Sequence, residues 1–255
     1  TTYSLADLRD GAHALADQRP PVRLGVLGDP VAHSLSPQLH RPALESAGID
    51  AAYVRLWIRP EEFAEAVRLL GPAGFFGANV TIPHKAAALA AVDEADPVAR
   101  RMGAVNTLVV EGDRLLGFST DGPGFVRAIR EEFGVDLRDL RVMIFGAGGG
   151  AGRSLAVQCA VERCERLVLV NRSPEKAQTL AQELAPDFRS ERLEGPAARL
   201  KAIPWEEAAL RREIEGVDLV VNATPVGMRR SDPPLLPPGL LRAFHLVYDT
   251  VYTAG

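Results

Sequence analysis

The chain has 255 residues, of which 47% are hydrophobic, 24% are charged and 6% are aromatic. These proportions exclude an intrinsically disordered, collagen-like or disulfide-stapled chain. The formal net charge of -4 provides no overall positive field, so neither nucleic acid nor an anionic membrane surface is expected as a partner. The length predicts two domains, and function must therefore lie in local sites.

Neither a membrane span nor a metal site is expected. No apolar run reaches the roughly 18 residues of a membrane helix, and residues 1–21 are polar with mixed charge, so we expect a cytoplasmic protein without a secretory leader. Cys159 and Cys164 are too few for a disulfide framework and are expected to be buried and inert. No metal is expected, because ligand spacing such as H-E-x-x-H is absent among His13, His33, His40, His84 and His245.

In the first half of the chain, short apolar runs alternate with helical patterns. The strand predictions are 22–27, 51–57 and 74–82, followed by a hairpin of 105–110 and 115–118. The helix predictions are 1–18, 36–47, 60–70, 84–92, a helix beginning at Asp96-Pro97, and 121–133. Ser36 is the predicted N-cap of the helix over 36–47, with Pro37 in its first position.

The second half restarts the alternation with a pattern typical of nucleotide-binding folds. Strands are predicted over 141–145, 167–171, 219–222 and 245–249, and helices over 149–164 and 174–184. Such alternation indicates parallel sheets in an α/β fold with two domains. We predict a catalytic domain over 1–124, with 1–20 as an N-terminal extension, and a Rossmann-type domain over 125–255.

A glycine-rich turn over 146–152 follows a predicted strand and precedes a predicted helix, the context of the Rossmann fingerprint. Gly146 would allow the tight turn, Gly148 would let the backbone approach a pyrophosphate, and Ala151 would stand where the helix packs on the strand. Amide groups at the helix start would face the anion. The alternative interpretation is a flexible turn that binds no ligand.

The residues after the next strand indicate NADP rather than NAD. Enzymes that use NAD usually carry an acid there for the ribose 2'-hydroxyl. This chain has Asn171-Arg172-Ser173, with Lys176 one turn later. A guanidinium can grip a 2'-phosphate with its planar fork, and a hydroxyl can add a further bond. Alternatively, the two cations are ordinary solvated charges at a helix start.

Polar groups gather at several predicted strand ends of the first half. Ser34 and Ser36 stand at the mouth of a helix, where free N–H groups and the helix dipole suit a carboxylate. Further amides, hydroxyls, an ammonium and a carboxylate come from the segments 77–85, 104–107 and 120–124. Together they describe a site for a small polyol acid, although each alone would be an ordinary cap or turn residue.

These segments closely resemble the shikimate dehydrogenase family, and the resemblance runs from Val22 to about Tyr252. The motifs that carry it are GDPVAHSLSP, GANVTIPHK, GAVNT, STDGPG, GAGGGAG, NRS, NATPVGM and YDTVY. The resemblance implies an N-terminal catalytic α/β domain and a C-terminal Rossmann domain that binds NADP. It also implies the reduction of 3-dehydroshikimate to shikimate on the route to aromatic compounds.

The resemblance further implies roles for individual residues. Lys85 and Asp121 would be the catalytic pair. The substrate would be bound by Ser34, Ser36, Asn79, Thr81, Lys85, Asn106, Asp121 and Tyr252. NADP would be lined by Gly146, Ala147, Gly148, Gly149, Gly150, Asn171, Arg172, Ser173, Lys176, Ala223, Thr224 and Thr250.

The chemistry of Lys85 agrees with this assignment. Hydride addition to a ketone carbon leaves an alkoxide, which a nearby ammonium can stabilise and protonate. A neighbouring Asp121 carboxylate would favour the charged lysine and fix its direction. The alternative is a surface ion pair, which is the ordinary state of an exposed lysine.

The chain departs from the family pattern at three places. Ser119 stands where the family usually has Asn, and Thr250 where it usually has Met, which puts the nicotinamide contact in doubt. The sequence stops at Gly255, where the family continues with a glycine-rich segment, a substrate-binding glutamine and a closing helix. We expect either a portion of the working protein or a chain without that closing contact.

Two alternative functions stay open. A quinate/shikimate dehydrogenase that uses NAD would need only small changes to accept one more ring hydroxyl. A non-catalytic sensor of pathway metabolites would keep the fold and bind without turnover. Retention of both Ser34 and Ser36 favours shikimate, and retention of Lys85 and Asp121 favours an enzyme. The expected assembly is a monomer or a homodimer.

Overall fold

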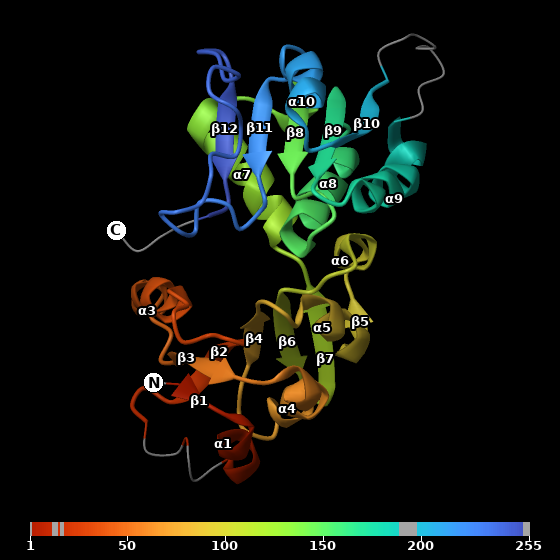
Figure 1. Cartoon of the computed structure of the whole chain (residues 1–255). Helices are drawn as coiled ribbons and strands as arrows, with labels where there is room; N and C mark the ends of the chain where they lie inside the picture. The colour runs from red at the N-terminus through yellow and green to blue at the C-terminus, as the bar shows by residue number, and fades with distance from the viewer. Residues whose placement is uncertain (1, 12–14, 16–17, 189–197, 252–255) are drawn as a thin grey trace. The chain divides into compact units, whose positions relative to one another are not determined.

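A computed structural model describes residues 2–11, 15, 18–188 and 198–251. The described chain divides into two compact units, Thr1–Thr120 and Asp121–Gly255 (Figure 1). The division falls at the start of helix α7 (Asp121–Phe133), so this helix belongs wholly to the C-terminal unit. The sequence-based boundary after residue 124 lies inside that helix.

The N-terminal unit is built on a seven-stranded mixed sheet within the described residues. Its strands, in spatial order, are β1 (Thr2–Tyr3), β3 (Ala52–Trp57), β2 (Val22–Gly28), β4 (Gly77–Val80), β6 (Thr107–Glu111), β7 (Arg114–Phe118) and β5 (Glu94–Ala95). The first four run parallel, and β6 is antiparallel to both β4 and β7. The predicted hairpin is therefore present as β6 and β7, inserted into a sheet whose other predicted strands are parallel.

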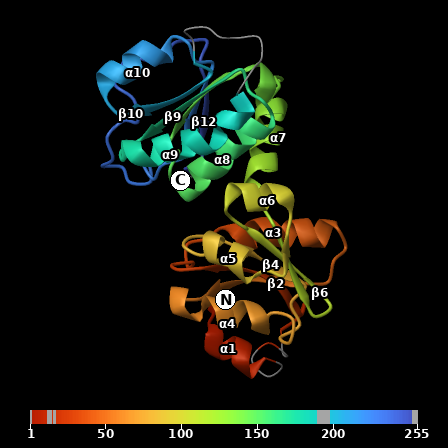
Figure 2. The same ribbon diagram turned by 90° about the vertical axis from the view of Figure 1, so that its right-hand side faces the viewer.

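The two faces of this sheet pack against different helices, because successive side chains of a strand point to opposite faces. The helices are α1 (Leu5–Asp10), α3 (Ser36–Ser46), α4 (Phe63–Leu69), α5 (Lys85–Ala91) and α6 (Pro97–Met102). One face packs with α1, α4, α5 and α6 in the main core. The other packs with α3 in a small cluster of Val26, Val31, Leu44 and Tyr53. In Figure 1, α3 lies apart from α4 and α5, and Figure 2 shows α1 beside α4.

The start of the chain differs from the prediction of one helix over 1–18. Thr2 and Tyr3 form the edge strand β1, and α1 ends at Gly11, whose φ is 50°. A glycine in this left-handed region ends the helix without the steric cost that a side chain would bring. A two-residue strand has too short a pattern to be distinguished from a helix start.

Ser36 is not the N-cap of α3, contrary to the prediction. The cap is Leu35, Ser36 is the first helical residue, and its amide donates to the Ser34 hydroxyl oxygen at 3.3 Å. The hydroxyl that satisfies a donor at this helix start is therefore that of Ser34, in a local turn two residues long. The side chain of Ser36 is thereby available for other contacts.

The C-terminal unit is built on a five-stranded parallel sheet within the described residues, in the order β10-β9-β8-β11-β12. The strands are β8 (Arg141–Phe145), β9 (Arg166–Asn171), β10 (Leu200–Pro204), β11 (Leu219–Asn222) and β12 (Leu246–Asp249). Besides α7, the helices are α8 (Gly150–Val161), α9 (Pro174–Leu184) and α10 (Glu207–Ile214), with 3-10 turns at Leu137–Asp139 and Ala185–Phe188. This strand order is that of a nucleotide-binding Rossmann sheet.

Cys159 and Cys164 are both free and fully buried, as predicted. Burial raises the pKa of the Cys159 thiol well above its ordinary value, so this thiol stays protonated and unreactive. Within the described part of the chain, no helix has the length and apolar character needed to cross a membrane.

Helix α8 packs directly on the glycine-rich turn through Gly152. A Cβ atom added to this residue would lie 2.1 Å from the carbonyl oxygen of Gly146 and 2.9 Å from the Cα of Ala147. Ala151, which was predicted to make this close contact, is instead exposed. That prediction was wrong because the run of five glycines and two alanines over 146–152 allows more than one register of the fingerprint. Only the folded helix fixes which residue faces the turn.

The substitution Gly152→Ala is expected to destabilise the protein by about 1–3 kcal/mol, because the added methyl group would force backbone atoms of the turn apart. Urea unfolding would measure the loss. Gly150→Ala is the matched control, since a Cβ there meets nothing within 4 Å and alanine is the better helix former. Equal stability of the two variants would contradict this account of the packing.

Candidate active site

The carboxyl ends of parallel strands β2, β3 and β4 meet at one edge of the N-terminal sheet. Antiparallel β6 begins at the same edge, where Thr107 lies opposite Asn79 of β4 and Phe118 of β7. The segments after β2 and β4, the segment before β6 and the segment after β7 therefore converge. These segments contain the substrate-site residues predicted between 34 and 106.

The loop before α3 is held in place by charged and aromatic side chains. The guanidinium of Arg55 donates two hydrogen bonds to the carbonyl oxygen of Ser34, at 2.9 Å from Nε and 2.6 Å from Nη2. The Ser34 hydroxyl donates to the Ser36 hydroxyl at 3.1 Å. His40 Nδ1 lies 2.9 Å from the carbonyl oxygen of Ser36. The structure thus brings the two predicted serines together.

The side chain of Asn79 occupies the centre of a polar network at this sheet edge. Its Oδ1 accepts a hydrogen bond from the Tyr53 hydroxyl at 2.7 Å, and its Nδ2 donates to Thr107 Oγ1 at 3.2 Å and to the Asn106 carbonyl at 3.4 Å. Tyr53 and Thr107 were not predicted as site residues. The signal for both is their strand position, because Tyr53 and Asn79 point to the α3 face and Thr107 is paired with Asn79.

Asn106 joins the start of β6 to the segment after β7. Its Oδ1 accepts hydrogen bonds from the Thr107 hydroxyl at 2.9 Å and the Thr120 amide at 3.0 Å, and its Nδ2 donates to Thr120 Oγ1 at 3.0 Å. The network therefore continues from Tyr53 through Asn79, Thr107 and Asn106 to Thr120. A row of amides and hydroxyls of this kind can recognise a ligand rich in hydroxyl groups.

Thr81 and Lys85 come after the end of β4, a few residues beyond Asn79 in the chain. The Thr81 amide donates to the Leu27 carbonyl at 2.9 Å, and a Cβ on Gly28 would lie 2.5 Å from Thr81 Cγ2, so the end of β2 needs glycine to admit Thr81. Lys85 is the half-buried first residue of α5, and its carbonyl accepts a hydrogen bond from Val105 at 3.0 Å. Both predicted residues therefore stand at the converging edge.

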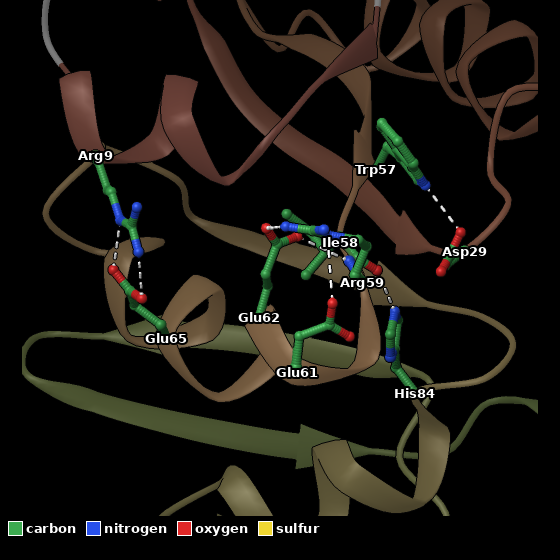
Figure 3. A network of polar contacts seen from close by, with 9 residues as sticks. All are labelled: Arg9, Asp29, Trp57, Ile58, Arg59, Glu61, Glu62, Glu65 and His84. Carbon is green, nitrogen blue, oxygen red and sulfur yellow. Dashed lines mark hydrogen bonds and ion pairs between the residues drawn. The ribbon is translucent and has the colours of Figure 1, made fainter.

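His84, the residue before Lys85, is held inside the unit, and Figure 3 shows its ring directed at Ile58. Only 1% of its side chain is exposed, its ring stacks on Phe63 with centroids 4.6 Å apart, and Nε2 lies 2.7 Å from the carbonyl oxygen of Ile58. Burial lowers the pKa of His84 below its ordinary value. A neutral imidazole thus fixes the start of α5 to the end of β3. In the same view, Trp57 Nε1 donates to Asp29 Oδ1 at 2.8 Å.

Two predicted substrate residues lie outside the N-terminal unit. Asp121 is the first residue of α7 in the C-terminal unit. The pKa of Tyr248 is raised chiefly by burial of the tyrosine and, to a smaller extent, by the negative charge of Asp121. Its pairing with Lys85 stays a prediction. Tyr252 lies outside the described residues.

The glycine-rich turn after β8 is the centre of the predicted cofactor site in the C-terminal unit. Gly146 has a φ of 81°, and a Cβ there would lie 2.7 Å from the Ala223 carbonyl oxygen and 2.8 Å from Thr224 Cγ2. A Cβ on Gly148 would lie 2.5 Å from Lys176 Cβ and 2.7 Å from Asn171 Nδ2. The turn thus brings the predicted segments around 171–176 and 223–224 together. Gly149 and Gly150 are exposed, whereas Ala147 is fully buried, so only its backbone can reach a cofactor.

The residues after β9 present positive charge beside this turn. Asn171 Oδ1 accepts a hydrogen bond from the Ser173 amide at 3.1 Å, which fixes the bend between β9 and α9. Arg172 and Lys176 are exposed, with Lys176 in the first turn of α9. No carboxylate stands at the end of β9, where one would repel a 2'-phosphate.

Asn222 organises the loop after β11 and was not predicted as a site residue. It is 2% exposed, and its Oδ1 accepts hydrogen bonds from the amide of Thr224 at 3.0 Å and from its hydroxyl at 2.7 Å. Its Nδ2 donates to the Val226 carbonyl at 2.9 Å and to Asp249 Oδ1 at 3.0 Å. The hydroxyl of Thr250 donates to the Asn222 carbonyl at 2.9 Å. An amide at the end of an otherwise apolar strand is the sequence signal for such a role.

Two family models match the two halves of the chain. Residues 26–108 match the shikimate dehydrogenase substrate binding domain, and residues 127–203 match the shikimate / quinate 5-dehydrogenase domain. The chain belongs to the shikimate dehydrogenase family. The resemblance stated from the sequence motifs is thereby confirmed.

Relatives within the shikimate dehydrogenase family extend this match over most of the chain. A protein of Salinibacter ruber named shikimate dehydrogenase (NADP(+)) is 43% identical over 231 residues, which cover 89% of this chain and 78% of that protein. The solved shikimate dehydrogenase of Aquifex aeolicus has a TM-score of 0.78 at 30% identity and covers 91% of this chain and 80% of its own. The solved shikimate dehydrogenase of Thermus thermophilus, in complex with NADP(H) and shikimate, has a TM-score of 0.74 at 37% identity. The match covers 89% of this chain and 78% of that one. The expected α/β fold of two domains is confirmed.

The buried His84 makes stability depend on pH. Because its pKa is lower in the folded than in the unfolded protein, its contribution is fully present above the unfolded pKa of about 6.5 and is lost as pH falls through the folded value. Urea unfolding measures the free energy of unfolding at pH 7 and at pH 5. Its decrease between these two pH values should be smaller for His84→Phe than for the wild type, although the variant is less stable at pH 7. Exposed His33 provides the control, His33→Gln, which should behave as wild type. If His84→Phe lost as much unfolding free energy between pH 7 and pH 5 as the wild type, the pH dependence would not come from His84.

Proposed function

We propose that this protein is an NADP-dependent oxidoreductase that interconverts 3-dehydroshikimate and shikimate, with Lys85 as proton donor and acceptor. The observation that carries the proposal is the row of hydrogen-bonded hydroxyls and amides from Tyr53 to Thr120, together with the Ser34–Ser36 pair, at the strand ends where Lys85 begins α5. Membership in the family and 43% identity to a relative named shikimate dehydrogenase (NADP(+)) support it.

The network divides by chemistry into two parts that suit the two ends of the substrate. The hydroxyls of Ser34 and Ser36 stand at the start of the 11-residue helix α3 and would hold the carboxylate. Asn79, Thr81 and Asn106 would bind the ring and its hydroxyls. Amides can donate to one hydroxyl and accept from another, so they suit a ligand whose hydroxyl groups do both. Tyr252 would add a contact from the YDTVY segment.

Lys85 performs the proton transfer in this proposal. Reduction of the ketone carbon places negative charge on its oxygen, and the Lys85 ammonium stabilises that charge and donates the proton. In the opposite direction, neutral Lys85 accepts the proton from the shikimate hydroxyl. The Asp121 carboxylate would favour the charged lysine and orient it.

The C-terminal site fits NADP by the shape of its turn. Any side chain at Gly148 would collide with Lys176 and Asn171, so the turn offers only its backbone there, as a pyrophosphate-binding turn requires. Arg172, Ser173 and Lys176 would hold the 2'-phosphate, while Gly146 to Gly150, Asn171, Ala223, Thr224 and Thr250 would line the rest. Bound NADPH supplies the hydride.

We also propose a cytoplasmic location and action as a monomer or homodimer. The two cysteines are free thiols, as is usual in a reducing compartment. The names of the relatives favour shikimate with NADP over quinate with NAD. The retained lysine, at the first position of α5, favours turnover over sensing without catalysis.

The first test is an absorbance assay of cofactor reduction with shikimate and NADP+. Wild-type protein should turn over, and Lys85→Ala should lower kcat by about 100- to 10,000-fold while KM for shikimate changes little, because a positioned acid acts mainly in the transition state. Lys201→Ala, in the C-terminal unit, is the lysine control and should keep wild-type kcat. Equal losses in kcat and in substrate affinity would assign Lys85 to binding, and binding of shikimate without turnover by wild type would favour the sensor.

Arg172→Ala should raise KM for NADPH by about 10- to 100-fold and leave KM for NADH nearly unchanged, because a charge-assisted hydrogen bond to the 2'-phosphate is lost. Steady-state assays with both cofactors measure this ratio. Arg138→Ala, in the same unit at the turn before β8, is the control and should alter neither value. A wild-type preference for NADH would overturn the cofactor assignment.

A further inference from the structure

Tyr53 lies where only a long side chain can join two parts of the site. It belongs to β3, and Asn79 belongs to β4, but β2 runs between these two strands. Tyr53 is paired with Leu24 of β2, and Asn79 with Val26. Neighbouring strands are about 4.8 Å apart, so the Tyr53 side chain must reach across β2 to meet Asn79. The 2.7 Å hydrogen bond shows that it does.

The ring of Tyr53 is fixed before its hydroxyl makes this contact. Its side chain is 6% exposed and packs in the small core beneath α3 with Val26, Val31 and Leu44. The His40 ring stacks on it with centroids 4.2 Å apart and planes 13° apart. The position of the hydroxyl is therefore determined by packing rather than by the hydrogen bond itself.

The hydroxyl and the ring of Tyr53 contact different parts of the site. The hydroxyl donates to Asn79 Oδ1, and the ring stacks on His40, whose Nδ1 lies 2.9 Å from the carbonyl oxygen of Ser36. Burial raises the pKa of Tyr53, so its hydroxyl remains a neutral donor. From Tyr53 to Asn106, each hydroxyl and amide donates to the next member of the row. Such one-way rows reinforce each bond through its neighbours.

The bond from Tyr53 also decides which way the Asn79 amide faces. With Oδ1 accepting from Tyr53, Nδ2 must face Thr107 and Asn106. Without the Tyr53 hydroxyl, Oδ1 would lose this donor, and the amide could rotate or turn over. Any ligand hydroxyl that binds Asn79 would then meet a less ordered partner.

We propose that Tyr53 is a positioning residue that couples the carboxylate-binding serines to the ring-binding Asn79, and thereby sets the affinity for the whole substrate. The inference rests on the proposed function, because that function assigns the two ends of the substrate to Ser36 and Asn79. Tyr53 does this through its hydroxyl, which holds Asn79, and its ring, which stacks on His40 beside Ser36, and it needs no contact with the substrate.

Steady-state kinetics of Tyr53→Phe test the proposal, since phenylalanine keeps the ring stacked on His40 and removes only the hydroxyl. We expect KM for shikimate to rise about tenfold, the usual scale for one lost buried hydrogen bond. We expect kcat to stay within about threefold and KM for NADP+ within about twofold, because ground state and transition state lose the same binding. Tyr3→Phe, which alters another buried tyrosine of the same unit, is the matched control and should keep the wild-type KM.

A double-mutant cycle separates positioning from general stability. If Tyr53 acts through Asn79, Tyr53→Phe should raise KM far less in an Asn79→Ala background than in the wild type. Thermal unfolding of each variant gives the accompanying change in stability. A Tyr53→Phe protein with lower thermal stability but wild-type KM for shikimate would overturn the proposal, as would equal rises in KM for shikimate and NADP+ or full additivity with Asn79→Ala.

Failure of the proposed function would be recognised separately. Wild-type protein without turnover of shikimate would contradict that function, and calorimetric titration of shikimate into wild type and Tyr53→Phe would then test the coupling alone. About tenfold weaker binding to Tyr53→Phe supports the coupling. Equal binding to both proteins, or no binding to either, overturns it.

Discussion

The antiparallel pairing of β6 with β4 determines where the polar residues of the N-terminal unit meet. Parallel strands bring only their carboxyl ends to one edge of a sheet. A strand that runs the other way brings its amino end there, which places Asn106 and Thr107 beside Asn79. The hairpin then returns the chain to the same edge after Phe118. Without this reversal, the amides would lie at opposite ends of the sheet, and the hydrogen-bonded row could not form.

Glycine performs a similar task at both sheets. In the N-terminal unit, Gly28 lets the methyl group of Thr81 approach the end of β2. In the C-terminal unit, Gly146, Gly148 and Gly152 let the turn approach the loop after β11, the start of α9 and its own helix α8. In each unit the polar groups gather where a missing side chain permits two loops to come close. The site and the packing that supports it therefore depend on the same few positions.

Much of the fold could be predicted from local pattern. The bounds of α7, β8, α9 and β11 match the predictions, because long amphipathic runs or apolar strands carry a clear period. Strands β1 and β5 have two residues each, which is too short for any period. Strand β10 is half-buried at every position and α10 is rich in charged residues, so neither stood out as an apolar run.

The sequence indicates candidate site residues that lie in a motif of their own and gives no signal for residues that act at a distance. Ser34, Asn79 and Gly148 lie in recognisable segments. Tyr53 is an ordinary strand residue by pattern, and its importance depends on its reach across β2, which is a property of strand order. Asn222 was part of a recognised motif, but its contacts with Asp249 and Thr250 become visible only when β11 and β12 are paired.

The two tryptophans of the chain are distributed one to each unit, which gives each unit its own optical reporter. The Trp57 indole is 49% exposed at the converging edge and bonded to Asp29, so its emission senses changes in solvent contact there. Trp205 is instead partly buried and packs edge-on against Phe145 of the Rossmann core, at a centroid distance of 5.2 Å. Fluorescence of single-tryptophan proteins can therefore follow occupancy of the sheet edge and melting of the nucleotide-binding unit as separate signals.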